Sequence, residues 1–244
     1  LHSIYKTFNA GTVNEKTALN GLNLHLNEGD FVTVIGGNGA GKSTMLNAVA
    51  GTWYEDEGKI TIDDIDVTKL PEHKRAKYLG RVFQDPMTGT AATMQIEENM
   101  ALAARRGMTR SLRPGITAKE REFYREQLKI LGLGLEDRLT SKVGLLSGGQ
   151  RQALTLLMAT LKKPRLLLLD EHTAALDPKT AAKVLETTDK IVNSEHLTTL
   201  MITHNMRDAI AHGNRLIMMN AGHVIYDVAG EEKKHLTVQD LLAK

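Results

Sequence analysis

The sequence predicts an α/β fold with a parallel sheet that carries a phosphate-binding site at one edge. Three largely apolar runs predict the parallel strands, at residues 31–35, 166–169 and 198–203. Strands of a parallel sheet are buried on both faces and therefore read as nearly continuous apolar runs. Each run leads into chemically distinctive residues: a glycine-rich stretch, the pair Asp170-Glu171, and His204. Because ligands bind at the carboxyl ends of such strands, we expect these groups to meet.

The composition fits one large globular domain. The chain has 244 residues, 41% of them hydrophobic, and a net charge of only +2, which is too mild to indicate nucleic-acid binding. It has no cysteine, which excludes disulfides and suits a reducing compartment such as the cytosol. No apolar stretch approaches the roughly 18 residues needed to cross a bilayer. Because Leu1 already reads as part of a strand, we expect a few native residues, including the initiator methionine, to precede it.

Short strands precede and follow the glycine-rich stretch. Residues 1–35 alternate between apolar and polar, most clearly at 22–26, and residues 58–67 predict an antiparallel strand pair. Phe8 lies in the first of these sheets, where its ring could stack on an adenine or simply fill the core. Residues 79–83 predict a further strand that delivers Gln84 to its carboxyl end.

The glycine-rich stretch has the pattern of a phosphate-binding loop. Its members are Gly36, Gly37, Asn38, Gly39, Ala40, Gly41, Lys42, Ser43 and Thr44. Glycines leave backbone N–H groups free to surround phosphate oxygens, and the helix that follows adds its positive end. Lys42 is expected to reach the β- and γ-phosphates, and the Ser43 hydroxyl to ligate Mg²⁺. The alternative is a tight turn without a ligand; the spacing and the attached Lys-Ser pair favour the phosphate site.

A helical insert is expected between the Gln84 segment and the next strand. Residues 96–139 turn helical and charged, with a capping box at Thr117–Glu120. One apolar face is expected to hold the following residues: Phe123, Gln127, Leu128 and Leu131. A basic run, read as solvated surface or else as a partner contact, comprises Arg105, Arg106, Arg110 and Arg113.

A second glycine-rich helix start follows the insert. Its residues are Leu146, Ser147, Gly148, Gly149 and Gln150. Ser147 is a natural N-cap, so a plain helix start is one interpretation. Two consecutive glycines nevertheless cost a helix about 2 kcal/mol, which indicates that something approaches this backbone closely. An anion is the natural candidate, because bare N–H groups and the helix dipole both attract it.

The acidic pair and the histidine complete the candidate chemistry. Asp170 is expected to hold Mg²⁺ and Glu171 to polarise an attacking water. A carboxylate pair at a strand end is often only a capping feature, and a lone histidine is usually structural. The phosphate loop in the same chain favours function for both, with His204 close to a γ-phosphate oxygen. A strand hairpin over 216–226 and a short helix over 237–243 are expected to end the chain.

Taken together, these motifs resemble those of the ATP-binding subunits of ABC transporters, over essentially the whole length. The phosphate loop, Gln84, the segment 146–150, the pair Asp170-Glu171, the segment 175–177 and His204 stand in the family's order. The resemblance implies a P-loop NTPase core of the RecA-like kind, with a mixed sheet, an antiparallel β subdomain and a helical subdomain insert. Residues 1–84 and 163–244 would form the catalytic core with the β subdomain, and residues 85–162 the helical subdomain, within a single domain 1–244.

The resemblance also implies roles that the residues alone did not. ATP would lie between the phosphate loop of one subunit and the helix start at Ser147 of another, in a head-to-tail homodimer. Phe8 takes the position of the adenine-stacking aromatic, and Gln84 would sense Mg²⁺ and a membrane partner. The dimer seam would include Ala175, Leu176 and Asp177.

Three residues depart from the family's pattern. Gly37 replaces Pro or Ser, His172 replaces Pro after Glu171, and Ala175 replaces Ser. None removes an expected phosphate, metal or water ligand. They put loop rigidity and a hydrogen bond across the seam in doubt, but not ATP hydrolysis.

The expected function is that of an ATPase that uses ATP and Mg²⁺ to power transport of a small solute, by closing a dimer beneath separate membrane subunits. An importer served by an extracellular solute-binding protein is favoured, at the cytoplasmic face of the membrane and without nucleic acid as a partner. The alternatives are a soluble ABC-type ATPase not tied to transport and the ATPase of an exporter with separate subunits. A P-loop kinase should lack the segment 146–150, and a module that no longer hydrolyses should lack Glu171 and His204.

Overall fold

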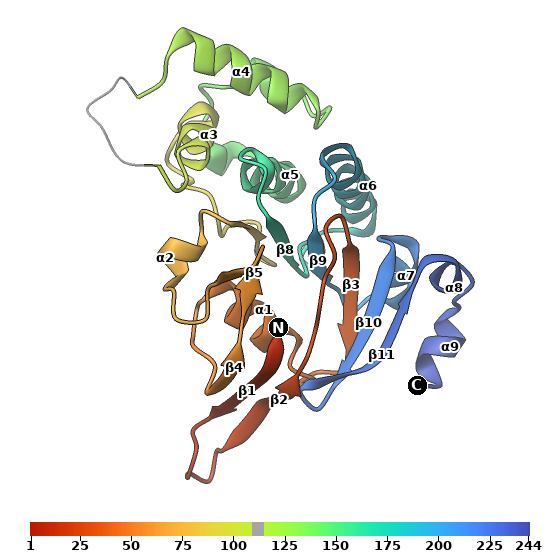
Figure 1. The fold of residues 1–244 in the computed structure, drawn as a ribbon. Helices are drawn as coiled ribbons and strands as arrows, with labels where there is room; N and C mark the ends of the chain where they lie inside the picture. Colours follow the sequence, from red (N-terminus) through yellow and green to blue (C-terminus); the bar gives the residue numbers. More distant parts are fainter. Residues whose placement is uncertain (109–114) are drawn as a thin grey trace.

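A six-stranded mixed sheet forms the centre of the molecule in the computed structural model, which describes residues 1–108 and 115–244 (Figure 1). Its strands, in their order across the sheet, are β11 (His223–Ala229), β10 (Arg215–Asn220), β3 (Phe31–Gly36), β9 (Thr199–Ile202), β8 (Leu166–Asp170) and β7 (Leu79–Val82). All neighbours pair in parallel except β10 and β11, which form the antiparallel hairpin expected near the C-terminus.

Alternate side chains of the parallel strands enter two different apolar cores. Leu167 and Leu169 of β8 pack in a cluster with α5 (Gly148–Thr160) and α6 (Pro178–Glu195). Leu168, one residue apart, packs in the cluster around α1 (Lys42–Ala50). Successive side chains of a strand point to opposite faces, so a strand covered by helices on both sides must be apolar throughout. This confirms the interpretation of the apolar runs.

A second sheet is antiparallel and lies beside the first. It comprises β2 (Lys16–Leu22), β1 (His2–Phe8) and β4 (Glu57–Lys59), followed by the hairpin of β5 (Thr61–Ile62) and β6 (Ile65–Asp66). The strand pair expected over 58–67 is thereby confirmed. The strand expected over 22–26 is wrong, because β2 ends at Leu22. Beyond it, Leu24 exchanges backbone hydrogen bonds with Leu1, at 2.8 and 3.1 Å, and belongs to no strand.

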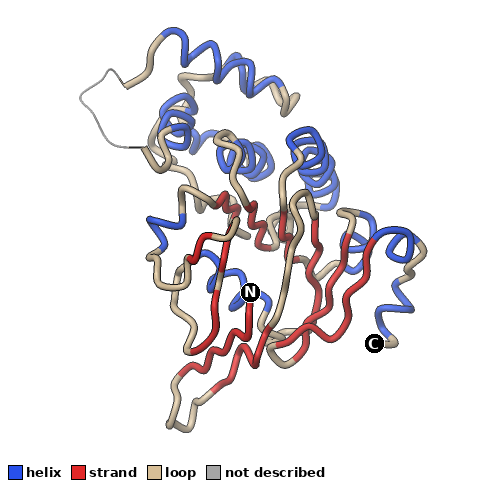
Figure 2. The backbone as a smooth tube through the Cα atoms, in the orientation of Figure 1, coloured by secondary structure: helices blue, strands red, loops and turns tan. Residues whose placement is uncertain are grey.

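The segment between β7 and β8 is helical, as expected, and includes α3 (Ile96–Ala104), α4 (Ala118–Lys129) and α5 (Figure 2). Thr117 and Glu120 form the expected capping box of α4. The expected apolar face is partly wrong: Phe123 is 45% exposed, and Tyr124 is buried with Leu128 and Leu131 instead. Residues 124, 128 and 131 follow the 4- and 3-residue spacing of one helix face, whereas Phe123 is turned away from it.

The basic run on this segment is only partly described. Arg110 and Arg113 lie outside the described residues. Arg105 pairs with Glu120 at 2.8 Å, and Arg106 donates to the carbonyls of Ala159 and Lys162. The two described arginines therefore have structural partners within the chain.

The helices not yet described are all short. They are α2 (Glu72–Arg75), α7 (Met206–Ala211), α8 (Gly230–Lys234) and α9 (Val238–Leu242), with 3₁₀ turns at Leu135–Asp137 and Val143–Leu145. The C-terminal helix α9 lies within the short helix expected over 237–243, and the Thr237 side chain caps its start. Within residues 1–108 and 115–244, no helix combines the length and apolar character that a membrane span requires.

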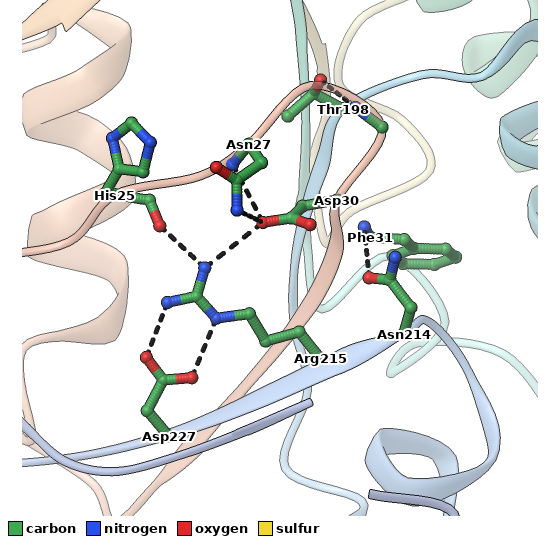
Figure 3. Close-up of polar contacts among 9 residues, drawn as sticks. His25, Asn27, Asp30, Phe31, Thr198, Asn214, Arg215 and Asp227 are labelled. Carbon is green, nitrogen blue, oxygen red and sulfur yellow. Dashed lines mark hydrogen bonds and ion pairs between the residues drawn. The ribbon is translucent and has the colours of Figure 1, made fainter. Parts of the chain in front are cut away.

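Polar side chains fix the start of β3 at the amino-terminal edge of the main sheet (Figure 3). The Arg215 guanidinium donates to both carboxylate oxygens of Asp227, at 2.8 and 2.6 Å, and to Asp30 at 3.2 Å. The Phe31 N–H donates to Asn214 Oδ1 at 2.9 Å. These bonds tie the start of β3, at Asp30 and Phe31, to the start of β10 and to β11.

Candidate nucleotide-binding site

The phosphate loop leaves the carboxyl end of β3 with three glycines at positive φ, and two of them also lie against neighbouring strands. Gly36 has φ +150° and Gly41 has φ +100°, both in the region that side chains disfavour. A Cβ on Gly36 would overlap the carbonyl oxygen of Met219, and one on Gly41 that of Ala18. These glycines therefore seat the loop against the neighbouring strands as well as exposing its N–H groups.

The middle of the loop is open to solvent. Gly37, Asn38 and Gly39 are exposed, and Ala40 is buried beneath them. A Cβ on Gly37 would meet nothing within 4 Å, and its φ is ordinary. The loop geometry therefore does not depend on having glycine at position 37.

The lysine and hydroxyl side chains of the loop begin α1. Lys42 is 7% exposed, and its ammonium donates to the carbonyls of Gly36 at 2.7 Å and Gly37 at 3.1 Å. Ser43 is exposed and Thr44 half-buried in the same first turn. A cavity of about 170 Å³ lies over the loop and is lined by its residues 38–44 together with Lys16, Ala18 and Glu171.

Glu171 and His204 face each other at the ends of neighbouring strands. Glu171 follows β8, His204 follows β9, and His204 Nδ1 lies 3.0 Å from Glu171 Oε1. Glu171 has φ +47°, an unfavourable value for a residue with a side chain. Its N–H donates to the carbonyl of Ile202 at 3.0 Å, which holds this turn. Glu171 is thereby directed toward the phosphate-loop cavity, and His204 lines a second cavity of about 390 Å³ that Glu171 shares.

Asp170 is the last residue of β8 and lies beside an arginine that the sequence analysis missed. Arg81 of β7 places its guanidinium 3.9 Å from the Asp170 carboxylate and donates to Asn47 of α1 at 2.5 Å. Burial raises the pKa of Asp170, and the Arg81 charge opposes that shift. The one signal in the sequence is that Arg81 is a charged residue inside an otherwise apolar strand. This signal does not identify Asp170 as the residue that Arg81 contacts.

Gln84 is exposed just beyond β7. The β7–β8 ladder pairs Val82 with Leu169, so Gln84 leaves the sheet next to the Asp170-Glu171 end of β8. Ser43, Gln84 and Asp170 can each offer a side-chain oxygen as a metal ligand at this edge. The described residues hold no cluster of three or more metal-ligating His, Asp or Glu side chains. This donor set fits Mg²⁺, which is bound by one or two carboxylates together with substrate phosphates and water.

The second glycine-rich helix start lies away from this cavity. Ser147 and Gln150 form a reciprocal capping box, with bonds of 3.3 and 3.1 Å. Gly148 is exposed, whereas Gly149 is buried, and a Cβ there would overlap the Thr180 side chain of α6. The close approach expected at these glycines is therefore made at Gly149 by the chain itself. Residues 146–150 line neither of the two cavities described above.

The remaining candidates lie on the surface around the site. Phe8 is half-buried and packs edge-on against Trp53, with ring centroids 5.3 Å apart. Asp177 caps α6 by accepting from the Thr180 N–H at 3.1 Å, and hydrogen bonds from Thr180 lower its pKa. The two residues before it differ in exposure: Ala175 is exposed and Leu176 half-buried.

A glycine-rich loop between a parallel strand and a helix, with a carboxylate and a histidine at the adjacent strand ends, defines a P-loop nucleotide-binding protein. The profile of the ABC transporter family matches residues 19–174. The chain is 46% identical over 228 residues to the tyrosine transport ATP-binding protein of Clostridioides difficile, covering 93% of this chain and 90% of that protein. The chain therefore belongs to the ABC transporter family, as an ATP-hydrolysing subunit.

More distant relatives and solved structures agree with this assignment. The spermidine/putrescine import ATP-binding protein PotA of Haemophilus ducreyi is 36% identical over 230 residues; the match covers 92% of this chain but only 58% of that protein. The solved dimer of the ATP-binding cassette MJ0796 with ADP and Pi matches with a TM-score of 0.78 at 30% identity, over 94% of this chain and 97% of that one. The ADP conformation of the cassette MJ1267 matches with a TM-score of 0.80 at 26% identity, over 98% and 93%. The expected fold, with its mixed sheet and antiparallel β subdomain, is confirmed.

Proposed function

We propose that this chain is the ATPase subunit of an importer for a small solute, and that Glu171 is its catalytic carboxylate. The observation that carries the proposal is the convergence of the phosphate loop and Glu171 on one cavity, with His204 in contact with Glu171. A carboxylate next to the γ-phosphate position can polarise a water for attack, and a histidine bound to it can orient it and contact the phosphate.

The other residues bind and orient the nucleotide. The phosphate loop surrounds the phosphates with N–H groups, and Lys42 exchanges its bonds to the loop carbonyls for the β- and γ-phosphates. Ser43, Asp170 and Gln84 would hold Mg²⁺, which when bound neutralises charge on the phosphates. Phe8 supplies a stacking surface for the base, braced by Trp53.

The second half of each site is proposed to come from another copy of the chain. Residues 146–150 form a helix start with an exposed Gly148 and line neither of the two cavities described above. A head-to-tail homodimer would place this helix start over the phosphates of the other subunit, and the D-loop residues 175–177 at the seam. The dimer of the related cassette supports this arrangement.

Transport requires partners that this chain does not contain. We propose that it docks under separate integral membrane subunits at the cytoplasmic face, with an extracellular solute-binding protein acting through them. The Gln84 segment and the helical residues 85–162 would form the subdomain that meets the membrane subunits, while 1–84 and 163–244 form the catalytic core. The names of the relatives suggest an amino acid such as tyrosine as the first solute to test, ahead of a polyamine.

The proposal is tested with Lys42→Ala, which removes the charge that offsets the triphosphate. We expect MgATP binding or turnover to be lost. Lys59→Ala is the matched control, because Lys59 lies on β4 with a largely exposed side chain. An ATPase rate equal to wild type in Lys42→Ala would contradict the assignment of the loop.

A further inference from the structure

The side-chain amide of Gln152 connects the ends of two neighbouring strands. Gln152 lies in the first turns of α5 and is 0% exposed. Its Nε2 donates to the carbonyl of Phe83 at 2.8 Å and to the carbonyl of His172 at 2.6 Å. Phe83 follows β7 and His172 lies two residues beyond β8, so both carbonyls lie past the paired residues of these strands.

These two carbonyls belong to the segments that carry the proposed chemistry. The Phe83 carbonyl is part of the peptide group that joins Phe83 to Gln84. His172 follows Glu171 directly, and its side chain is buried with Nε2 3.0 Å from Thr188 Oγ1. One amide group therefore sets the separation of the Gln84 segment and the Glu171 segment.

The other end of the Gln152 amide has no partner among residues 1–108 and 115–244. Its Oε1 is buried and makes no hydrogen bond. An unpaired buried acceptor is unfavourable, and an apolar residue of similar size would avoid it. The two bonds donated by Nε2 are therefore what this glutamine supplies, and they also fix which end of the amide is nitrogen.

Arg151, the residue before Gln152, contacts the Gln84 segment further along the chain, at Met87 and Thr90. Arg151 is 4% exposed, and its guanidinium donates to Thr90 Oγ1 at 2.7 Å and to the Met87 carbonyl at 3.3 Å. Consecutive side chains of α5 thus hold the segment 83–90 at both ends. These bonds connect that segment to the helix whose first turn is Gly148-Gly149-Gln150.

We propose that Gln152 is a positioning residue for ATP hydrolysis, which holds the Gln84 segment and the Glu171 segment in register with each other and with the start of α5. The inference rests on the proposed roles of Gln84 and Glu171. It assigns to Gln152 no contact with ATP.

The test is Gln152→Met, which keeps the length of the side chain and removes both donated bonds. Misplacement of reacting groups by about 1 Å costs up to ~100-fold in rate, so we expect kcat for ATP to fall about 10- to 100-fold. The Kd for MgATP, measured in the Glu171→Gln background, should stay within about twofold, because no phosphate-loop contact changes. Retained MgATP binding also shows that the variant is folded.

Thr160→Val is the matched control on the same helix. Thr160 is 8% exposed, and its hydroxyl donates to the α5 carbonyls of Leu156 and Leu157, at 3.0 and 3.1 Å. This substitution removes a buried polar group that lies about two helical turns beyond Gln152 on α5, and kcat should stay within about twofold of wild type. An equal fall of kcat in Thr160→Val would show a general effect of weakening α5 and would overturn the inference.

A double-mutant cycle separates positioning from packing. If Gln152 acts through the Gln84 segment, Gln152→Met should lower kcat much less in a Gln84→Ala background than in wild type. Independent effects of the two changes, or a wild-type kcat in Gln152→Met, would overturn the inference and leave the proposed function intact. Full turnover by Glu171→Gln alone would instead overturn the proposed role of Glu171, and with it this inference.

Discussion

Gly36 and Gly37 are adjacent in the phosphate loop but differ in what a side chain would meet, and substitution of each by alanine separates loop geometry from loop flexibility. Gly36 has φ +150°, and a Cβ there would overlap the Met219 carbonyl of β10. Backbone strain of this kind costs about 1–3 kcal/mol, and overpacking against a rigid strand about 1–3 kcal/mol more. We expect Gly36→Ala to lower the free energy of unfolding by about 2–6 kcal/mol and to weaken MgATP binding.

Gly37→Ala is the control at the neighbouring position. Its Cβ would meet nothing within 4 Å, and its φ is one that alanine adopts. Removing glycine at such a site reduces the freedom of the unfolded chain and stabilises by about 0.4–1 kcal/mol. Urea unfolding followed by circular dichroism measures both variants, and titration with MgATP measures binding. Equal stability of Gly36→Ala and wild type, or a large loss in Gly37→Ala, would refute the derived loop geometry.

Two further variants test the base contact and the buried histidine. Phe8→Ala should weaken ATP and GTP about equally, by ~1 kcal/mol or about fivefold in Kd, because a ring face accepts any purine; a loss for one nucleotide only would reveal contacts to the base edge. Burial lowers the pKa of His172 from 6.5 to about 4. Below about pH 6.5, His172 is protonated in the unfolded chain but stays neutral in the folded chain. The free energy of unfolding therefore falls as the pH drops from there toward 4. Between pH 7.5 and 5.0, wild type should lose ~2 kcal/mol more in urea unfolding than His172→Gln; identical losses would contradict the burial of a neutral His172.

The sequence predicted the parts of the fold that depend on local pattern. The continuous apolar run of β8 follows from burial on both faces, the capping box at Thr117 from the spacing of two side chains, and the N-cap at Ser147 from its residue type. The phosphate loop was recognisable because glycine, lysine and serine at this spacing have one common physical use. The ends of β3, β8 and β9 could be expected to meet because parallel strands share an edge.

Features that depend on contacts between distant residues were not predictable. The 45% exposure of Phe123 depends on which side of α4 meets the core, and helix periodicity alone allowed either neighbour. Residues 23–26 alternate like a strand, but pairing requires a partner strand as well as a pattern. The neighbours of Gly149, Asp170 and Gln152 come from α6, β7 and two strand ends, and nothing local in the sequence specifies them.

The two departures nearest the site have physical explanations in the structure. Gly37 sits where a side chain would be free of contacts, so its effect is confined to loop flexibility. His172 is fully buried against Thr188, and its carbonyl is held by Gln152, so the turn after Glu171 is fixed without the proline that the family uses. Nothing in the structure explains Ala175, which is exposed.

The central claim is that Glu171 drives hydrolysis of ATP shared between two copies of the chain, and Glu171→Gln tests it most directly. The substitution keeps the shape of the side chain and all phosphate-binding groups but removes the charge that polarises water. We expect MgATP binding to persist, turnover to fall by a factor on the order of 10² or more, and size-exclusion chromatography with MgATP to show a stable dimer, while wild type returns to monomer. A variant that stays monomeric at saturating MgATP would contradict the shared site, and one that hydrolyses ATP at the wild-type rate would contradict the role of Glu171.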